Sequence, residues 1–159
     1  GADQLRHQRA LAGGGARPSA RPSIEAWREE AALDNVLPSL ELDVLTAPWP
    51  ISRADHVFSA NTVHIMSWEG VCACFTGVDA LLKPGQDFCL YGPFNYDGQF
   101  TSVSNLRFDG WLRQRDPKSG IRDVTDLTEL ADKHGLALVN DFEMPVNNRI
   151  LQWRKSGTK

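Results

Sequence analysis

The stretch Ala54-Asp-His-Val-Phe-Ser-Ala-Asn-Thr-Val-His-Ile65 decides how the rest of the chain is interpreted. It begins with strand formers, His56-Val57-Phe58, and passes into small and polar residues, Ser59-Ala60-Asn61. A strand that ends in polar residues ahead of a helix is typical of the carboxyl edge of an open α/β sheet, where such sheets bind ligands. We therefore expect a site at this edge. The same pattern also fits an ordinary buried strand followed by a polar turn.

The clearest helix pattern in the chain follows directly, and Ser67 is its expected N-cap. Apolar residues recur there at helical spacing: Val71, Cys74, Phe75, Val78, Leu81 and Leu82. Lys83-Pro84-Gly85 should end this helix, because proline and glycine break helices. Phe88–Tyr91 is then expected to be a short buried strand.

Upstream, Ser23 is the predicted cap of a helix over Ile24–Leu33, and Leu40–Val44 alternates like a strand. Downstream, Ser104 is the predicted cap of a helix that runs to about Arg115. This helix is expected to turn Leu106, Trp111 and Leu112 inward.

Asp123 should cap a further helix that ends at Gly135. Leu136–Phe142 and Ile150–Trp153 are predicted to be strands. The loop Met144–Asn148 is short, so these two strands should pair antiparallel. Strands that alternate with helices predict an α/β fold with three layers, a mostly parallel sheet and an antiparallel C-terminal hairpin.

Length and composition narrow the class of protein. The 159 residues fit one domain, and 42% apolar with 23% charged residues is typical of globular chains. The formal net charge of −3 gives no electrostatic reason to expect a nucleic-acid partner. No apolar run approaches the ~20 residues that span a bilayer, and the N-terminus has no secretory pattern. We therefore expect a cytoplasmic protein without a membrane partner.

The three cysteines, Cys72, Cys74 and Cys89, are an odd number without a C-x-x-C pair. Reduced and mostly buried thiols are the simplest interpretation, and no metal site is expected.

Residues 1–22 differ in composition from the rest, with Gly13-Gly14-Gly15 and repeated Arg-Pro-Ser. We predict an irregular or flexible arm here, and a domain over residues 23–155. The glycine triplet has neither the preceding strand nor the following helix of a phosphate-binding loop.

Several short motifs, taken in order, carry a family resemblance over about Ile24 to Arg154. They are Leu42-Asp43-Val44, Ser59-Ala60-Asn61 with His64, Leu81–Gly85, Tyr91-Gly92-Pro93-Phe94, Asp97-Gly98, Ser104-Asn105 with Phe108-Asp109, Gly120–Asp123 and Met144–Asn148. Together they resemble the second half of a class I S-adenosyl-L-methionine (SAM)-dependent methyltransferase. More narrowly, they are similar to the family that includes methyltransferase-like protein 26.

The resemblance implies a set of cofactor contacts. Asp43 and Val44 would lie beside the SAM adenine, and Ser59, Ala60 and Asn61 along its methionine portion. Such methyltransferases have a first strand, a glycine-rich loop and a second strand with an acidic end before this region, and none is visible in residues 1–22. We therefore expect a truncated chain that lacks N-terminal strands and whose SAM binding is impaired.

The resemblance also implies an acceptor pocket bordered by His64, Tyr91 and Pro93, with Asn147 and Asn148 closing over it. His64 and Tyr91 are the candidate catalytic residues, because an oxygen or nitrogen acceptor can require a base and a histidine titrates near neutrality. Each residue has a structural alternative: a turn histidine, a core aromatic or a pair of turn-forming asparagines.

The sequence thus favours a SAM-dependent methyltransferase-like protein with an unidentified methyl acceptor. A non-catalytic α/β binding module, or a degenerate fragment without SAM binding, stays open as an alternative. The sequence leaves the oligomeric state open.

Overall fold

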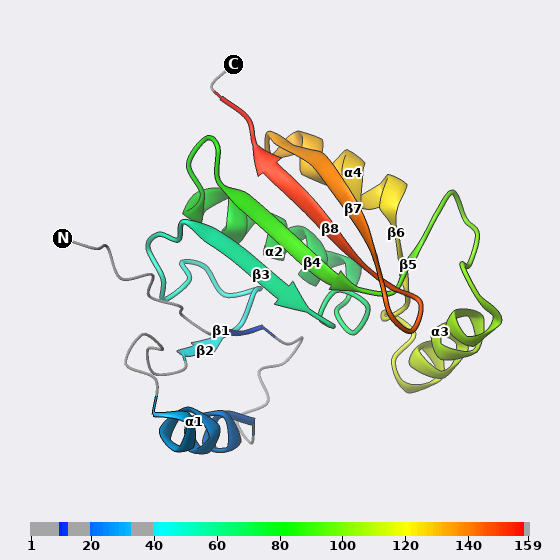
Figure 1. Ribbon diagram of the computed structural model, residues 1–159, viewed down its shortest axis with the longest axis horizontal. Helices are drawn as coiled ribbons and strands as arrows, with labels where there is room; N and C mark the ends of the chain where they lie inside the picture. The colour runs from blue at the N-terminus through cyan, green and yellow to red at the C-terminus, as the bar shows by residue number, and fades with distance from the viewer. Residues whose placement is uncertain (1–9, 13–19, 33–39, 158–159) are drawn as a thin grey trace.

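The computed structural model describes residues 10–12, 20–32 and 40–157. Its main sheet has four strands in the order β3-β4-β8-β7 (Figure 1). These strands are β3 (His56–Ala60), β4 (Asp87–Gly92), β8 (Asn148–Lys155) and β7 (Leu136–Met144). β3 and β4 pair parallel, whereas β8 pairs antiparallel with both β4 and β7. The predicted antiparallel C-terminal hairpin is confirmed.

Two small parallel sheets accompany the main one. β1 (Ala10–Ala12) pairs with β2 (Leu40–Leu42), and β5 (Phe94–Asn95) pairs with β6 (Arg122–Asp123). Of the five strand pairs in the described residues, three are therefore parallel and two antiparallel. This is the mostly parallel α/β arrangement that the alternation of elements predicted.

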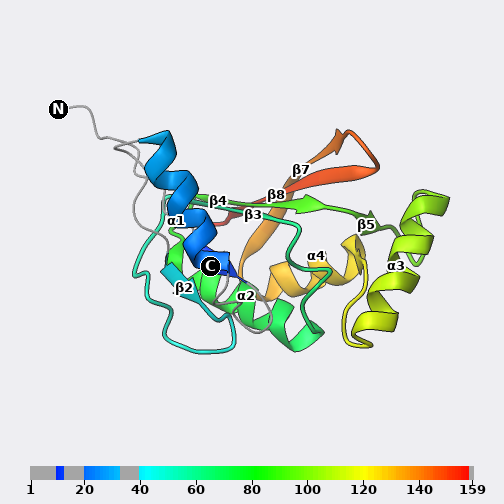
Figure 2. The ribbon, with the colours of Figure 1, turned by 90° about the horizontal axis from the view of Figure 1, so that it is seen from below.

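The core lies between the main sheet and two helices, α2 (Trp68–Leu81) and α4 (Val124–Lys133), which cover the same face (Figure 2). Phe75 of α2 packs edge-on against Phe88 of β4 and Trp153 of β8, with ring centroids 5.3 and 5.6 Å apart. All three side chains are fully buried. Burial of such rings is the main stabilising contribution of this layer.

Helix α2 follows its sequence pattern closely. Ser67 is the N-cap, and its Oγ accepts the amide of Gly70 at 3.1 Å. The apolar residues predicted for the inner face are all buried, from Val71 to Leu82. The 3.6-residue period therefore placed this helix and its packing face correctly.

Helix α3 (Val103–Arg115) departs from its prediction. Its N-cap is Ser102, which accepts the amide of Asn105, and not Ser104. Leu112 is buried as expected, but Leu106 and Trp111 are about half exposed, at 51% and 50%. Asn105 and Asp109 share the inner face with Leu112.

The N-terminal region contains more regular structure than expected. Within the arm predicted over residues 1–22, Ala10–Ala12 forms β1, and α1 (Ala20–Ala31) begins before Ser23, which is not its cap. Pro22 is compatible with this start, because the first four amides of a helix have no intrahelical acceptor. The expectation that neither a strand nor a helix flanks Gly13–Gly15 is wrong, because β1 precedes the triplet and α1 follows it. The triplet itself lies outside the described residues.

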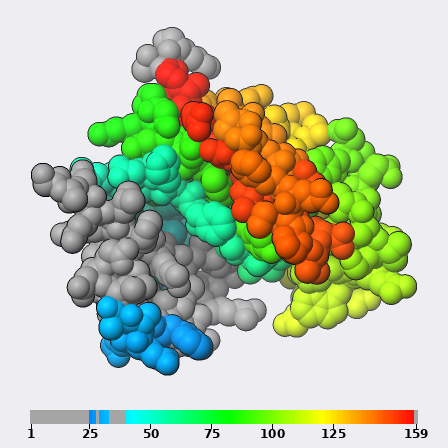
Figure 3. All heavy atoms as spheres, viewed as in Figure 1, coloured from blue at the N-terminus to red at the C-terminus, as the bar shows by residue number. Residues whose placement is uncertain are grey.

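The other face of the main sheet is the one seen in Figures 1 and 3, and it carries exposed side chains. Phe58 on β3 is 62% exposed. Near the amino end of β4 a polar row crosses three strands: Arg154 and Gln152 both donate to Asp87, and Asn140 donates to Gln152. The hydrogen bond from Arg154 holds the pKa of Asp87 below its usual value.

The cysteines are free, and burial raises the pKa of the Cys74 thiol to about 12. Among the helices that the structure describes, none is long and apolar enough to cross a membrane.

Candidate functional site

The carboxyl ends of β3 and β4 meet at one edge of the main sheet, which we call the rim. Ala60 is paired with Tyr91 in the parallel register, and the amide of Asn61 donates to the Tyr91 carbonyl at 2.9 Å. Asn61 has a positive φ of 56°, a conformation that asparagine tolerates better than most residues. This turn directs the chain away from the sheet, and the Ser59 and Thr62 hydroxyls, 2.6 Å apart, join its two sides.

His64 lies in the loop behind this turn and is only 5% exposed. Its carbonyl accepts the amide of Gly120 at 2.9 Å, but within the described residues its Nδ1 is buried without a hydrogen-bond partner. A Cβ placed on Gly92 would lie 3.6 Å from this Nδ1 and 3.8 Å from Asn61 Oδ1. The three residues therefore converge at the end of β4.

The electrostatic surroundings keep His64 neutral. Burial, assisted by the positive charge of Arg122, lowers the pKa of His64 from 6.5 to about 4. Its imidazole is therefore neutral near neutral pH, and one of its two ring nitrogens has a lone pair that can accept a proton.

The Arg122 side chain donates hydrogen bonds to the loop that carries His64. Its Nε donates to the Val63 carbonyl at 3.1 Å, and its Nη2 donates to the Met66 carbonyl at 2.5 Å. The guanidinium also lies over the Trp68 ring, with Cζ 5.8 Å from the centroid. The position of His64 thus depends on the partly buried guanidinium of Arg122.

The tip of the β7–β8 hairpin approaches the rim. Asn148 Nδ2 donates to the Tyr91 hydroxyl at 3.1 Å, and Asn147 Nδ2 donates to Ser104 Oγ at 3.2 Å. Pro93 is buried directly after β4. The structure therefore brings Asn61, His64, Tyr91, Pro93, Asn147 and Asn148 into one region at the end of β3 and β4.

Asp43 and Val44 are not brought to this rim by the main sheet. They follow β2, which belongs to a separate two-stranded sheet on the side of β3 away from β4 (Figure 1). The predicted strand Leu40–Val44 forms only over Leu40–Leu42, and it pairs with β1 and not with the main sheet. Asp43 Oδ1 accepts the amide of Leu45 and Oδ2 the Thr46 hydroxyl, while the Val44 side chain is buried in the core.

Helix α3 also contributes to the site, which the sequence did not predict. The ring of Phe108 lies edge-on to His64, with centroids 5.5 Å apart, and Trp111 stacks on Phe108 at 5.9 Å. The spacing of Phe108 and Trp111 indicated that their rings are neighbours, because residues three apart on a helix lie side by side on its surface.

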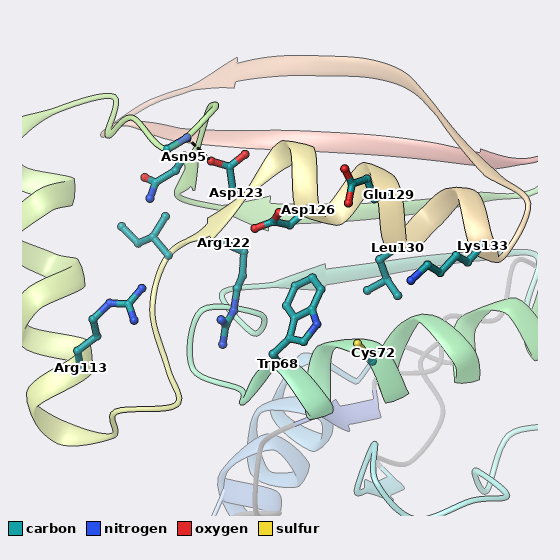
Figure 4. A pocket seen from close by; sticks show the side chains of 12 residues that line it. Trp68, Cys72, Asn95, Arg113, Arg122, Asp123, Asp126, Glu129, Leu130 and Lys133 are labelled. Carbon is teal, nitrogen blue, oxygen red and sulfur yellow. Dashed lines mark hydrogen bonds between the residues drawn. The ribbon is translucent and has the colours of Figure 1, made fainter.

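A groove of about 700 Å³ lies elsewhere, between the first turn of α2, α4 and the loop before β6 (Figure 4). Trp68, Cys72 and Leu130 line it, together with the charged side chains of Arg113, Arg122, Asp123, Asp126, Glu129 and Lys133. None of the site residues predicted from the sequence lines this groove.

Comparison with solved structures identifies the class of fold. The chain is similar to an O-methyltransferase family protein from Burkholderia thailandensis (15% identity, TM-score 0.78, covering 96% of this chain and 45% of that one). It is also similar to mitomycin 7-O-methyltransferase MmcR (17%, 0.75, 97% and 50%) and to the SAM-dependent methyltransferase SibL (19%, 0.72, 98% and 52%). The fold is that of the class I methyltransferases, and the chain spans about half the length of these structures.

The family follows from the sequence itself. Residues 3–155 match the family described as "Protein of unknown function (DUF938)", and the chain belongs to it.

Proposed function

We propose that the protein takes part in SAM-dependent methyl transfer to an oxygen or nitrogen acceptor. One observation carries this proposal: a neutral, buried histidine, His64, has an unpartnered Nδ1 at the carboxyl rim of a methyltransferase fold. A buried polar atom without a partner is rare in folded proteins and calls for an explanation. A methyl acceptor that donates its proton at this point would supply one.

We assign the methionine portion of SAM to Ser59, Ala60 and Asn61, and the adenine to Asp43 and Val44. The rim residues fit this role, because Asn61 directly follows β3 and has an exposed side chain next to Gly92. The fit at Asp43 is weaker, since both of its carboxylate oxygens already accept hydrogen bonds within a turn. SAM supplies an electrophilic methyl group on a sulfonium.

The residues of this chain would orient the acceptor and take its proton. In the overall reaction an acceptor oxygen or nitrogen forms a bond to the methyl carbon, the sulfur–methyl bond breaks with its electron pair left on sulfur, and one proton is released. His64 Nδ1 would receive this proton and pass it to solvent. Tyr91, held by Asn148, together with Pro93 and Asn147, would fix the acceptor in line.

We also propose that the protein is related to methyltransferase-like protein 26 and that it is cytoplasmic. A non-catalytic α/β binding module is the second candidate. The turn-capping role of the Asp43 carboxylate favours it, because that carboxylate has a structural purpose without any ligand.

Calorimetric titration with SAM and with S-adenosylhomocysteine tests the proposal. We expect micromolar binding that is lost in Asp43→Ala and is unchanged in Asp132→Ala, an exposed carboxylate on α4. If a folded sample gives no heat with either compound, the methyltransferase proposal fails and the binding-module candidate is favoured.

A further inference from the structure

Helix α3 buries polar side chains and exposes apolar ones. Its inner face buries Asn105 and Asp109, while Val103, Leu106 and Trp111 are at least half exposed. These exposed side chains do not form one patch, so the question is which of them lies next to the rim.

The buried polar groups of α3 have hydrogen-bond partners outside the helix. Asn105 Nδ2 donates to Thr101 Oγ1 at 3.0 Å and to the Asn147 carbonyl at 3.4 Å. Asp109 accepts the amide of Ile121 and the Nε of Arg113, each at 2.9 Å. These anchors and the buried Leu112 attach the helix, so Val103, Leu106 and Trp111 stay exposed.

One stripe of α3 faces the rim. Ser104, Phe108, Trp111 and Arg115 are spaced i, i+4, i+7 and i+11, so they share a side of the helix. Ser104 contacts Asn147 at the hairpin tip, and Phe108 contacts His64. Trp111 is stacked nearly parallel on Phe108, at 18°, and the Arg115 guanidinium lies 4.7 Å from the Trp111 ring. Figure 1 shows α3 next to the hairpin tip and the end of β4.

This aromatic row leads from solvent to a group that lacks a partner. Its inner end is His64, more than nine-tenths buried with Nδ1 unpartnered, and its outer end is the half-exposed indole of Trp111. Leu106, equally exposed, lies on a different side of the helix and does not continue the row. A flat ring fits such a row, because aromatic rings stack with centroids about 4.5–7 Å apart.

We propose that the stripe Phe108–Trp111 binds the methyl acceptor, and that this acceptor is a small planar aromatic compound with a hydroxyl or amino group directed to His64. This inference rests on the proposed methyl transfer and names the class of its acceptor. It makes Trp111 a residue that determines specificity.

A matched pair of compounds tests the proposal on the full chain: 2-naphthol, which is planar, and decahydro-2-naphthol, which carries the same hydroxyl on a saturated frame. Ligand-observed NMR titration should give an affinity for 2-naphthol at least about fivefold higher. Trp111→Ala should weaken 2-naphthol binding roughly 3- to 10-fold. Phe108→Leu, which keeps an apolar side chain of similar bulk, should weaken it less.

Leu106→Ala is the matched control, since it removes an equally exposed apolar side chain of the same helix. It should leave the affinity unchanged. Equal affinities for the two compounds, or equal losses in Trp111→Ala and Leu106→Ala, would overturn the inference.

Titration of the same samples with SAM separates the two proposals. SAM binding together with no preference for 2-naphthol overturns the aromatic acceptor alone. A preference for 2-naphthol that depends on Trp111, without SAM binding, overturns the methyl transfer and with it the role of acceptor.

Discussion

At the scale of single residues, His64 links stability to pH. The pKa of its side chain is about 4 in the folded protein, below its ordinary value of 6.5. Between these two values the unfolded chain binds more protons than the folded one, so the free energy of unfolding rises with pH through this window. The contribution of His64 is fully present above about pH 6.5 and is lost as the pH falls towards 4.

We predict that His64→Gln, which cannot gain a proton, removes this part of the pH dependence. Urea unfolding at pH 4.5 and 7.5 should show a smaller difference in the free energy of unfolding than for the unmodified protein, by on the order of 2 kcal/mol. His56→Gln changes an exposed histidine of β3 and serves as the control. Equal pH dependence in His64→Gln and the unmodified protein would show that His64 is protonated easily when folded.

The residue scale also shows what a sequence can indicate. Ser59–Asn61 and His64 follow a recognisable strand, so their place at the carboxyl rim was predictable. The role of Gly92 was not, because only the register of β3 on β4 brings it to His64 and Asn61. The position of Asp43 was equally unpredictable, because no local sequence feature indicates which sheet the preceding strand joins.

At the scale of elements, α2 and α3 differ in how much their sequences determine. The apolar period of α2 was enough to place its buried face. In α3, Asn105 and Asp109 take the inner positions because partners distant in the sequence, Asn147 and Ile121, satisfy them. Periodicity predicts a packing face only when apolar burial decides it.

Two glycines give a matched test of helix packing. A Cβ on Gly77 of α2 would lie 2.1 Å from the Trp49 ring, whereas one on Gly110 of α3 would meet nothing within 4 Å. Gly77→Ala should displace Trp49, whose Nε1 donates to the Val44 carbonyl, and destabilise the fold by about 1–3 kcal/mol.

Gly110→Ala should instead be neutral or stabilising by up to about 1 kcal/mol, because alanine is the better helix former. Thermal or urea unfolding of both variants measures the difference. If Gly77→Ala proves as stable as Gly110→Ala, Trp49 does not pack on α2 as described.

At the scale of the whole molecule, the parts should differ in local stability. β4 is paired on both sides within the main sheet, whereas β2 belongs to a two-stranded sheet. Two-stranded sheets are marginally stable by themselves. Hydrogen exchange should therefore be at least roughly 100-fold faster for the amides of Leu40–Leu42 than for those of Phe88–Leu90.

Mass spectrometry of peptides that cover the two strands measures this difference, with β8 as a second slow reference. Equal protection of β2 and β4 would mean that both sheets open together as one cooperative unit. The β1–β2 pair was not predictable, because Ala10-Leu11-Ala12 contains no strong strand former and its partner is distant in the chain.

The position of β8 has a consequence for how the polypeptide matures. It lies between β4 and β7, yet it follows both of them in the chain. β4 is therefore synthesised long before its partner β8, and its border on that side stays unpaired until the C-terminal hairpin of β7 and β8 is complete. Chaperones that shield such borders during synthesis should matter more for this protein than for one whose strands pair in the order of translation.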